Sequence, residues 1–282
     1  MAQTRFLTRG RIATWALLPV ALLAMSFLFS PDKLILHPST ESSSSIGATR
    51  RTIPFEGGEL EVWTGRSRRL APTAQPDAYF LRFYGNADRA DPNVGIDALE
   101  WRGRPVEIWG VNFPGYGGST GPATLRRIGP AALAAYDALK AVAGDRPIIA
   151  YGTSLGTTAA LHVAASRPVA GVILQNPPPL RQIALRQFGW WNLWLIAGPI
   201  ALRIPSALDS IGNARHVHTP GVFILSERDG TVLPRYQRLV VDAYAGPKQV
   251  FTLPGADHND PLDAPTQAGV YAAVDRMLNV TR

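Results

Sequence analysis

The chain has 282 residues, of which 46% are hydrophobic and 17% are charged, a balance that excludes an intrinsically disordered protein and suits one large folded domain. The formal net charge is +7, but aromatic residues do not alternate with basic ones as in a nucleic-acid groove, so we expect no nucleic-acid partner. The basic excess favours anionic surfaces such as lipid headgroups, or it reflects amino-acid usage alone. Cysteine is absent, which excludes disulfides, thiolate metal sites and a cysteine nucleophile.

The first apolar segment, residues 12–29, contains no charge and is close to the roughly 20 residues that span a bilayer. Three arginines precede it, which predicts a cytoplasmic N-terminus over 1–11, a transmembrane signal anchor over 12–30 and export of the rest to the periplasmic or extracytoplasmic side. The alternative is a cleaved signal peptide with a small-x-small site at 24–26, which would give a secreted form. We favour a single-pass anchor, because the apolar run continues beyond that site.

Serine and other polar residues dominate the next segment, 31–51, which we interpret as a polar linker to a folded domain over 52–282. That domain opens with a predicted hairpin over 51–65, with the Gly57-Gly58 pair at its turn. Six further β-rich runs alternate with helical stretches at 122–143, 155–166 and 234–245. The predicted strands lie within 77–85, 104–112, 146–152, 169–175, 220–227 and 248–255.

A hairpin followed by repeated strand-helix-strand units predicts an α/β fold with a mostly parallel, doubly wound sheet. In such sheets the functional groups gather at the carboxyl ends of the strands. Residues 177–219 break the alternation, and we interpret them as a cap insertion over the site. Their aromatic side chains suit core packing, an acyl-chain pocket or contact with a membrane interface, where amphipathic rings are favoured.

The segment Gly152-Thr153-Ser154-Leu155-Gly156 has the pattern G-x-S-x-G at the junction of a predicted strand and a predicted helix. There a serine sits on a sharp, strained turn, and glycines prevent collision between strand and helix. A serine at a helix start can instead cap the helix. A nucleophilic serine needs a base, and the base needs a third group that fixes its tautomer.

Later strands supply both partners in the order acid, then histidine. Asp229 follows the strand at 220–227, and His258 lies in the loop after the last strand. Glu227 is a rival acid, although it lies nearer the strand. Asp257 and Asp260 are too close to His258 in sequence to orient its ring. Any contribution of Asp260 would be to support the residues that contact the ring.

An oxyanion hole requires two backbone N–H groups aimed at the developing negative charge. Leu155, at the helix start, supplies one of them. The loop after the strand at 77–85 supplies the other, and we assign it to Asn86, with Ala87 as the alternative. Gly85 lets the backbone of this loop approach the serine.

These motifs resemble those of the α/β-hydrolases, in the group that includes single-pass lysophospholipid lipases, protein depalmitoylases and uncharacterised bacterial relatives. The matching segments are YGNAD, GVNFPGYGGSTG, GTSLG, SERDGTVLP and GADHND. The resemblance implies the α/β-hydrolase fold, with Ser154, Asp229 and His258 at the triad positions and Asn86 and Leu155 at the oxyanion positions. Two residues depart from the pattern of that group: Tyr84 replaces a histidine, and Asn112 replaces an aspartate that often begins the G-Y-G loop.

We therefore predict a membrane-anchored serine hydrolase that cleaves acyl esters or thioesters through an acyl-enzyme, with a lipid-like substrate such as a lysophospholipid. No metal or organic cofactor is expected. The alternatives are a serine peptidase of the same fold and a catalytically silent, membrane-anchored binding protein. The predicted substrate-binding side chains are aromatic: Tyr84, Phe113, Tyr116, Phe188, Trp190, Trp191 and Trp194.

Overall fold

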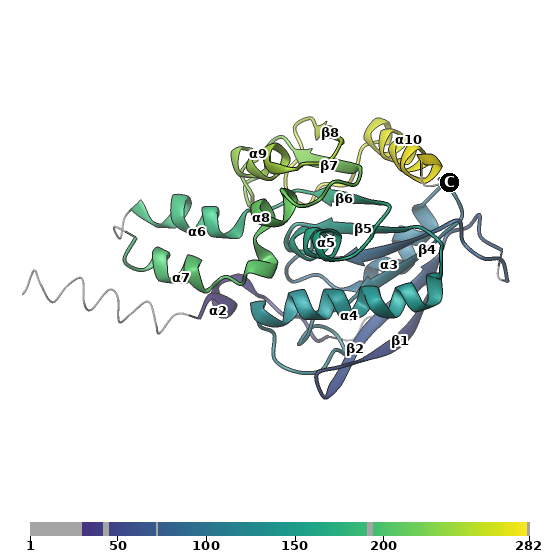
Figure 1. Cartoon of the computed structure of the whole chain (residues 1–282), viewed down its shortest axis with the longest axis horizontal. Coiled ribbons are helices and arrows are strands. Elements are labelled where there is room, and N and C mark those ends of the chain that lie inside the picture. The colour runs from purple at the N-terminus through teal and green to yellow at the C-terminus, as the bar shows by residue number, and fades with distance from the viewer. Residues whose placement is uncertain (1–29, 42–44, 72, 191–193, 281–282) are drawn as a thin grey trace, which may run out of the picture.

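The structure is a computed structural model, and it describes residues 30–41, 45–71, 73–190 and 194–280 (Figure 1). The predicted transmembrane anchor and Trp191 lie outside these residues. Within the described ranges, no helix combines the length and the apolar character needed to cross a membrane.

Eight strands form one sheet in the order β1-β2-β4-β3-β5-β6-β7-β8. β1 pairs with β2, and β2 with β4, in antiparallel fashion, whereas all later neighbours are parallel. Every predicted strand segment after the hairpin overlaps one strand, so the mostly parallel sheet is confirmed. The strands are β1 (Ala48–Phe55), β2 (Gly58–Arg66), β3 (Ala78–Phe83), β4 (Val106–Val111), β5 (Ile148–Thr153), β6 (Gly171–Gln175), β7 (Gly221–Ser226) and β8 (Lys248–Leu253).

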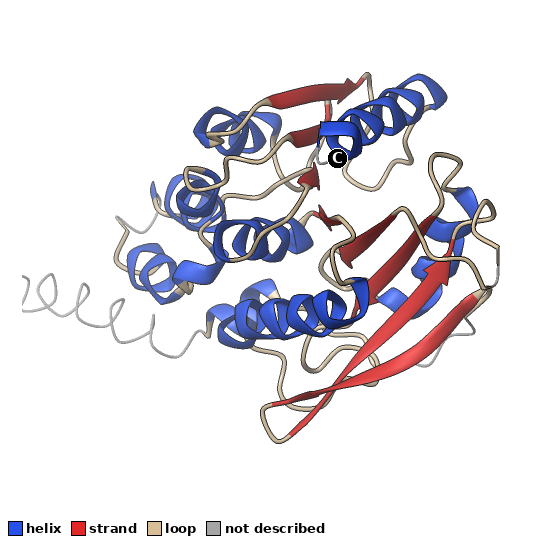
Figure 2. Ribbon diagram, turned by 45° about the vertical axis from the view of Figure 1, so that its right-hand side comes forward, coloured by secondary structure: helices blue, strands red, loops and turns tan. Residues whose placement is uncertain are grey.

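The N-terminal hairpin of β1 and β2 is the long, twisted ribbon at the edge of the sheet (Figure 2). Phe55 pairs with Gly58, so the turn consists of Glu56 and Gly57, one residue earlier than predicted. Both turn residues have positive φ, 45° and 76°, as a two-residue type I′ turn requires. That turn twists in the same sense as the strands it joins, which explains the tight hairpin.

Helices cover both faces of the sheet, as the doubly wound prediction requires. α4 (Leu125–Ala143), α5 (Leu155–Ser166) and α9 (Pro234–Ala243) pack on one face, and α3 (Ala90–Glu100) and α10 (Ala264–Val280) on the other. Because both faces are covered, central strands such as β3 and β4 are buried at every position, which explains why their sequences are mostly apolar. Arg82 and Glu107 are the buried charged residues of these two strands.

The cap predicted over 177–219 lies between β6 and β7. It contains α6 (Leu180–Phe188), α7 (Ala197–Arg203), the 3-10 turn η2 (Ser206–Leu208) and α8 (Ser210–Ala214). α8 packs against α5 and α9, whereas α6 and α7 pack against each other at one end of the molecule (Figure 1).

Residues 31–51 differ from the polar linker that the serine-rich composition suggested. Residues Pro31–Ile35 form a short helix, α2, and β1 begins at Ala48, before the predicted domain start at 52. Leu36 is buried in the main core. The composition is misleading because apolar side chains before the serines pack against the domain, and the chain after them pairs with β2.

Candidate active site

Ser154 sits between β5 and α5 with φ 49° and ψ −123°, a strained backbone conformation that costs about 1–3 kcal/mol. A Cβ on Gly152 would lie 2.5 Å from the backbone of Thr157, and a Cβ on Gly156 would lie 2.2 Å from the carbonyl oxygen of Phe83. Any larger residue at either position would collide with these atoms, so the close approach of β5, β3 and α5 requires both glycines. The turn holds the Ser154 side chain at the carboxyl end of the central strand, at the start of α5.

The side chains of Ser154, His258 and Asp229, from three separate loops, form a continuous hydrogen-bond network. The Ser154 Oγ lies 2.9 Å from Nε2 of His258, and Nδ1 of the same ring lies 2.6 Å from Oδ2 of Asp229. Asp229 is 1% exposed and His258 is 9% exposed. With its proton on Nδ1, the imidazole donates to the aspartate and leaves Nε2 free to accept the serine proton.

Asp229 occupies a position where every carboxylate lone-pair direction has a donor. Its Oδ1 accepts from the backbone N–H groups of Thr231 and Val232, at 2.8 and 2.7 Å, and its Oδ2 accepts from Nε2 of Gln237 as well as from the histidine. The rival acid Glu227 is exposed and accepts instead from the N–H of Gly255. Asp229 is thus the carboxylate that contacts His258.

The loop that carries His258 is held by its own carboxylates. Asp257 accepts from the N–H of Gly230 at 3.0 Å and from the N–H of His258 at 2.7 Å, and these two hydrogen bonds lower the pKa of Asp257. Asp260 accepts from the N–H of Asp257. These contacts join the histidine loop to the aspartate loop, which keeps the two triad partners in register.

Asn176, which the sequence analysis did not identify, supports the loop that carries His258. It follows β6, is fully buried and has φ 51°. Its Nδ2 donates to Oγ of Ser226 at 3.1 Å and to the backbone carbonyl of His258 at 3.0 Å, and its Oδ1 accepts from the N–H of Ser226. A polar residue directly after a buried strand was the available signal. Gln237, the donor to Asp229, was also missed because it lies inside a helix.

The loop after β3 approaches the nucleophile closely. A Cβ on Gly85 would lie 3.6 Å from Cβ of Ser154, so glycine lets the next residues reach the serine. Leu155 begins α5, where backbone N–H groups have no partner within the helix. Leu155 and Asn86 therefore lie on two backbone segments that flank Ser154, as the predicted oxyanion hole requires.

The side chain of Asn86 makes three contacts with distant residues that the sequence did not reveal. Its Oδ1 accepts from the N–H of His37 at 2.9 Å and from the hydroxyl of Tyr116 at 3.0 Å, and its Nδ2 donates to the carbonyl of Ile35. Burial raises the pKa of Tyr116 to about 12, so this hydroxyl stays protonated and acts as a donor. Asn86 thus joins the loop beside Ser154 to the segment after α2.

The loop after β4 begins with Asn112, and its contacts explain why aspartate is absent there. The Asn112 amide donates to Oε2 of Glu61 at 2.6 Å, while its Oδ1 accepts from the N–H of Ala90. Glu61 also accepts from the N–H of Gly118. An aspartate at 112 would place two carboxylates in contact, so asparagine is the residue that this loop requires.

The structure places the predicted substrate-binding aromatics in different surroundings. Tyr84 is buried on the α3 side of the sheet, with its hydroxyl 2.7 Å from Oδ2 of Asp97, and Phe113 packs parallel to Phe83 in the main core. These contacts are those of core residues. Trp190 and Trp194 are exposed. Phe188 is the last residue of α6, and its side chain lies outside the described part of the structure. Contact of these aromatics with substrate stays a prediction.

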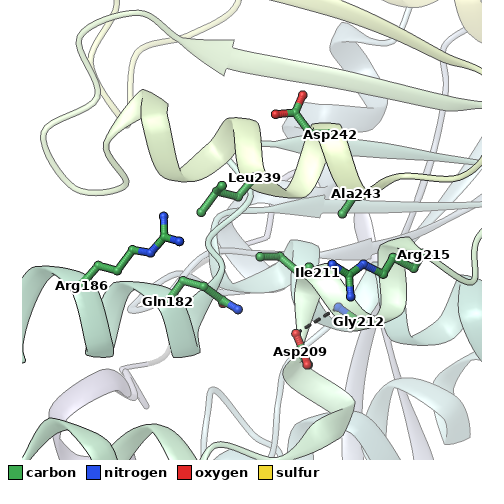
Figure 3. Close-up of a pocket in the computed structure, with 9 residues that line it drawn as sticks. All are labelled: Gln182, Arg186, Asp209, Ile211, Gly212, Arg215, Leu239, Asp242 and Ala243. Carbon is green, nitrogen blue, oxygen red and sulfur yellow. Dashed lines mark hydrogen bonds between the residues drawn. The ribbon is translucent and has the colours of Figure 1, made fainter. Parts of the chain in front are cut away.

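A pocket of about 620 Å³ lies between the cap helices α6 and α8 and helix α9 (Figure 3). Arg186 and Arg215 line it together with Asp209 and Asp242, so its walls are polar, and no triad residue contributes to it. In the described part of the chain, no three histidine or acidic side chains gather closely enough to hold a metal ion.

No known protein-family profile matches the chain. An uncharacterized protein of Mycobacterium tuberculosis, MT2364, is 28% identical over 254 residues, which cover 86% of this chain and 86% of that protein. Protein bem46 of Schizosaccharomyces pombe is 23% identical over 262 residues, covering 87% and 86%. The solved structure of the Pyrococcus furiosus esterase Pf2001 has a TM-score of 0.61 at 13% identity and covers 86% of this chain and 98% of its own.

The eight-stranded mixed sheet, the strained serine turn and the buried Ser154–His258–Asp229 network agree with these similarities. The chain has the α/β-hydrolase fold and is distantly homologous to bem46 and to uncharacterized mycobacterial proteins.

Proposed function

We propose that this protein is a serine hydrolase that cleaves acyl esters or thioesters through a covalent acyl-enzyme. The observation that carries the proposal is the unbroken hydrogen-bonded chain from Ser154 through His258 to Asp229, with the serine on a strained turn. Strain of this kind persists only where surrounding structure imposes it, and it is concentrated at functional sites.

In the first half of the reaction, Oγ of Ser154 attacks the acyl carbonyl carbon while Nε2 of His258 takes the hydroxyl proton. Asp229 stabilises the imidazolium that results. The backbone N–H groups of Leu155 and Asn86 stabilise the oxyanion of the tetrahedral intermediate. His258 then gives its proton to the leaving alcohol or thiol as the bond to the acyl carbon breaks.

In the second half, His258 takes a proton from water, and the resulting hydroxide attacks the acyl carbon of the ester on Ser154. A second tetrahedral intermediate forms in the same oxyanion hole. Its collapse releases the carboxylic acid, and the proton returns from His258 to Ser154.

The substrate in this proposal is a lipid-like ester such as a lysophospholipid, acted on outside the cytoplasm by a single-pass membrane protein. The uncharged segment 12–29, with arginines before it, supports the anchor. Exposed Trp190 and Trp194 on the cap support an apolar acyl chain or membrane as the neighbour of the site.

The test is to label the purified full-length protein in detergent with a fluorophosphonate probe, with Ser154→Ala as control. We expect labelling of the wild type alone, and equal labelling of the variant would overturn Ser154 as the nucleophile.

Hydrolysis of an ester series of increasing chain length then tests the substrate class. A preference for acetyl over long chains would exclude a lipid-like substrate, and faster cleavage of matched amides would favour a peptidase. A folded protein that neither labels nor hydrolyses would be a silent binding protein.

A further inference from the structure

We infer that α2 and the α6–α7 pair of the cap form a surface that rests on the lipid bilayer, so that the candidate active site opens toward the membrane. This inference rests on the proposed function, because it takes the segment 12–29 to be a membrane anchor. The proposed surface, called the cap face below, consists of Leu34 on α2, Trp190 and Trp194 between α6 and α7, and Leu202 on α7.

The cap face gathers apolar side chains that the fold leaves in water. Leu202 is 85% exposed, Trp190 is 68% exposed, and Leu34 and Trp194 are each 50% exposed. α2 packs against α7, and α6 packs against α7, so the elements that carry these side chains are neighbours at one end of the molecule (Figure 1). Apolar side chains grouped in this way mark a contact surface rather than scattered exposure.

The chain after α2 is fixed to the domain at several points. Asp32 accepts from the N–H of Leu125 at the start of α4, at 2.7 Å, and Leu36 is buried in the main core. Beyond it, the carbonyl of Ser39 accepts from the N–H of Gly117 at 2.9 Å. α2 is therefore part of the folded domain and does not swing freely.

This attachment places the end of the apolar segment. Phe29, its last residue, is separated from the first residue of α2, Pro31, by Ser30 alone. Two residues of extended chain reach at most about 7 Å. A bilayer that holds the segment 12–29 must then have its surface close to α2, and hence close to the cap face.

Charge also suits a membrane surface. Residues 177–208 include Arg186 and Arg203 but no aspartate or glutamate, and α2 carries Lys33. Arg181, in the same range, is paired with Asp209 at 3.1 Å. The single carboxylate on α2, Asp32, is already bound to the N-terminus of α4. A surface with more basic than acidic side chains is attracted to anionic lipid headgroups.

The tryptophans have the form expected at an interface. The indole N–H of Trp194 donates to the carbonyl of Leu185 at 2.8 Å, so the exposed part of the ring is apolar. Tryptophan is enriched where protein meets the headgroup region, because one part of the ring is apolar and the other is polar.

The same segment that follows the anchor contacts the loop beside the nucleophile, through the hydrogen bonds of Ile35 and His37 to Asn86. These hydrogen bonds therefore fix how the loop beside Ser154 is oriented relative to the segment that follows the anchor.

The absence of cysteine permits a direct test with single labels. Full-length Leu34→Cys and Leu202→Cys, each labelled with an environment-sensitive fluorophore, are reconstituted into vesicles of phosphatidylcholine and phosphatidylglycerol. The matched control is Val142→Cys, which is also 50% exposed but lies about 25 Å along α4 from Leu125, the residue that Asp32 contacts.

We expect a blue shift and a severalfold gain in emission at positions 34 and 202 on reconstitution, with quenching by lipids spin-labelled near the headgroup, and no change at position 142. Emission at 34 and 202 that stays like that at 142, in protein that floats with the vesicles, would overturn the cap face while leaving the anchor intact. Protein that does not float with the vesicles would overturn both the anchor and the cap face. Fluorophosphonate labelling of the same samples reports the hydrolase separately.

Discussion

The backbone N–H of His37 donates to Oδ1 of Asn86 at 2.9 Å, so the segment after α2 is bound directly to the loop beside Ser154. The sequence positions of the two residues are 49 apart. The contact gives the Asn86 side chain a positioning role in addition to the role proposed for its backbone N–H.

Replacing Asn86 with alanine keeps the backbone N–H but removes the contacts to Ile35, His37 and Tyr116. We expect kcat on a soluble short-chain ester to fall roughly 10- to 100-fold with little change in KM, because a misplacement of about 1 Å in the catalytic groups has effects of that size. Tyr116→Phe, which removes one of the contacts, serves as the graded control and should cause a smaller loss. Unchanged kcat in Asn86→Ala would show that the loop holds its position without this side chain.

Replacing Asp229 with asparagine should lower kcat by about 10⁴-fold, because an amide there favours the wrong tautomer of His258. Glu227→Gln is the matched control, since Glu227 lies two residues away and its carboxylate accepts from the N–H of Gly255 instead of contacting His258. Steady-state kinetics with a soluble ester measure both. Comparable losses in the two variants would contradict the assignment of the triad acid.

Asn176→Gly removes the side chain that joins Ser226 to the carbonyl of His258 and keeps a residue that tolerates φ 51°. Loss of these buried hydrogen bonds should lower the free energy of unfolding by about 3 kcal/mol. We also expect a fall in kcat at constant KM, because the histidine loop is no longer braced. Chemical denaturation and ester kinetics on the same samples separate the two effects, and a loss of stability with unchanged kcat would limit Asn176 to a structural role.

Glu61→Gln tests how much the Glu61 carboxylate stabilises the loop after β4, where it accepts hydrogen bonds from Asn112 and Gly118. Burial raises the pKa of Glu61, but its hydrogen bonds with Arg50, Gly118 and Asn112 outweigh this and lower the pKa overall. A lowered folded-state pKa means that the stabilisation is present above the unfolded value of about 4.3 and is lost as the pH falls through the folded value.

We therefore expect Glu61→Gln to cost about 1–3 kcal/mol at neutral pH, and the difference from wild type to shrink as the pH falls below about 4. Denaturant titrations at several pH values measure it. A difference that stays constant down to acidic pH would show that the carboxylate charge contributes nothing. Asn112→Asp should be destabilising at neutral pH and improve on acidification, because its carboxylate would face Glu61.

Much of the site could be predicted from local sequence, since a nucleophile turn needs glycines on both sides and parallel strands end at one edge of the sheet. Ser154, Asp229 and His258 each follow a predicted strand, so their convergence at one edge of the sheet could be expected. Gly152 and Gly156 could be expected for the same reason, because a strand and a helix that meet at such a turn leave no room for a Cβ.

The hydrogen-bond partners of these residues depended on contacts between distant segments. Glu227 and Asp229 are nearly equivalent by position, and only the direction of each side chain distinguishes them. Tyr84 lies beside the candidate site in sequence, yet the alternation of β3 turns it to the opposite face of the sheet, against Asp97. The position of Asn176 directly after β6 marks it only weakly, and its contacts with Ser226 and His258 depend on the tertiary structure.

The sequence by itself determined the order of strands and helices, the serine turn and the identity of the histidine, because these depend on periodicity and on steric limits within a few residues. The tertiary structure decided that Asp229 is the carboxylate that contacts His258, that Asn176 and Gln237 support the site, and that the segment after Pro31 packs on the domain and contacts Asn86. Except for Gln237 and Asp229, which are eight positions apart, those contacts join residues at least 29 positions apart in the chain, and packing between distant segments brings them within hydrogen-bond distance.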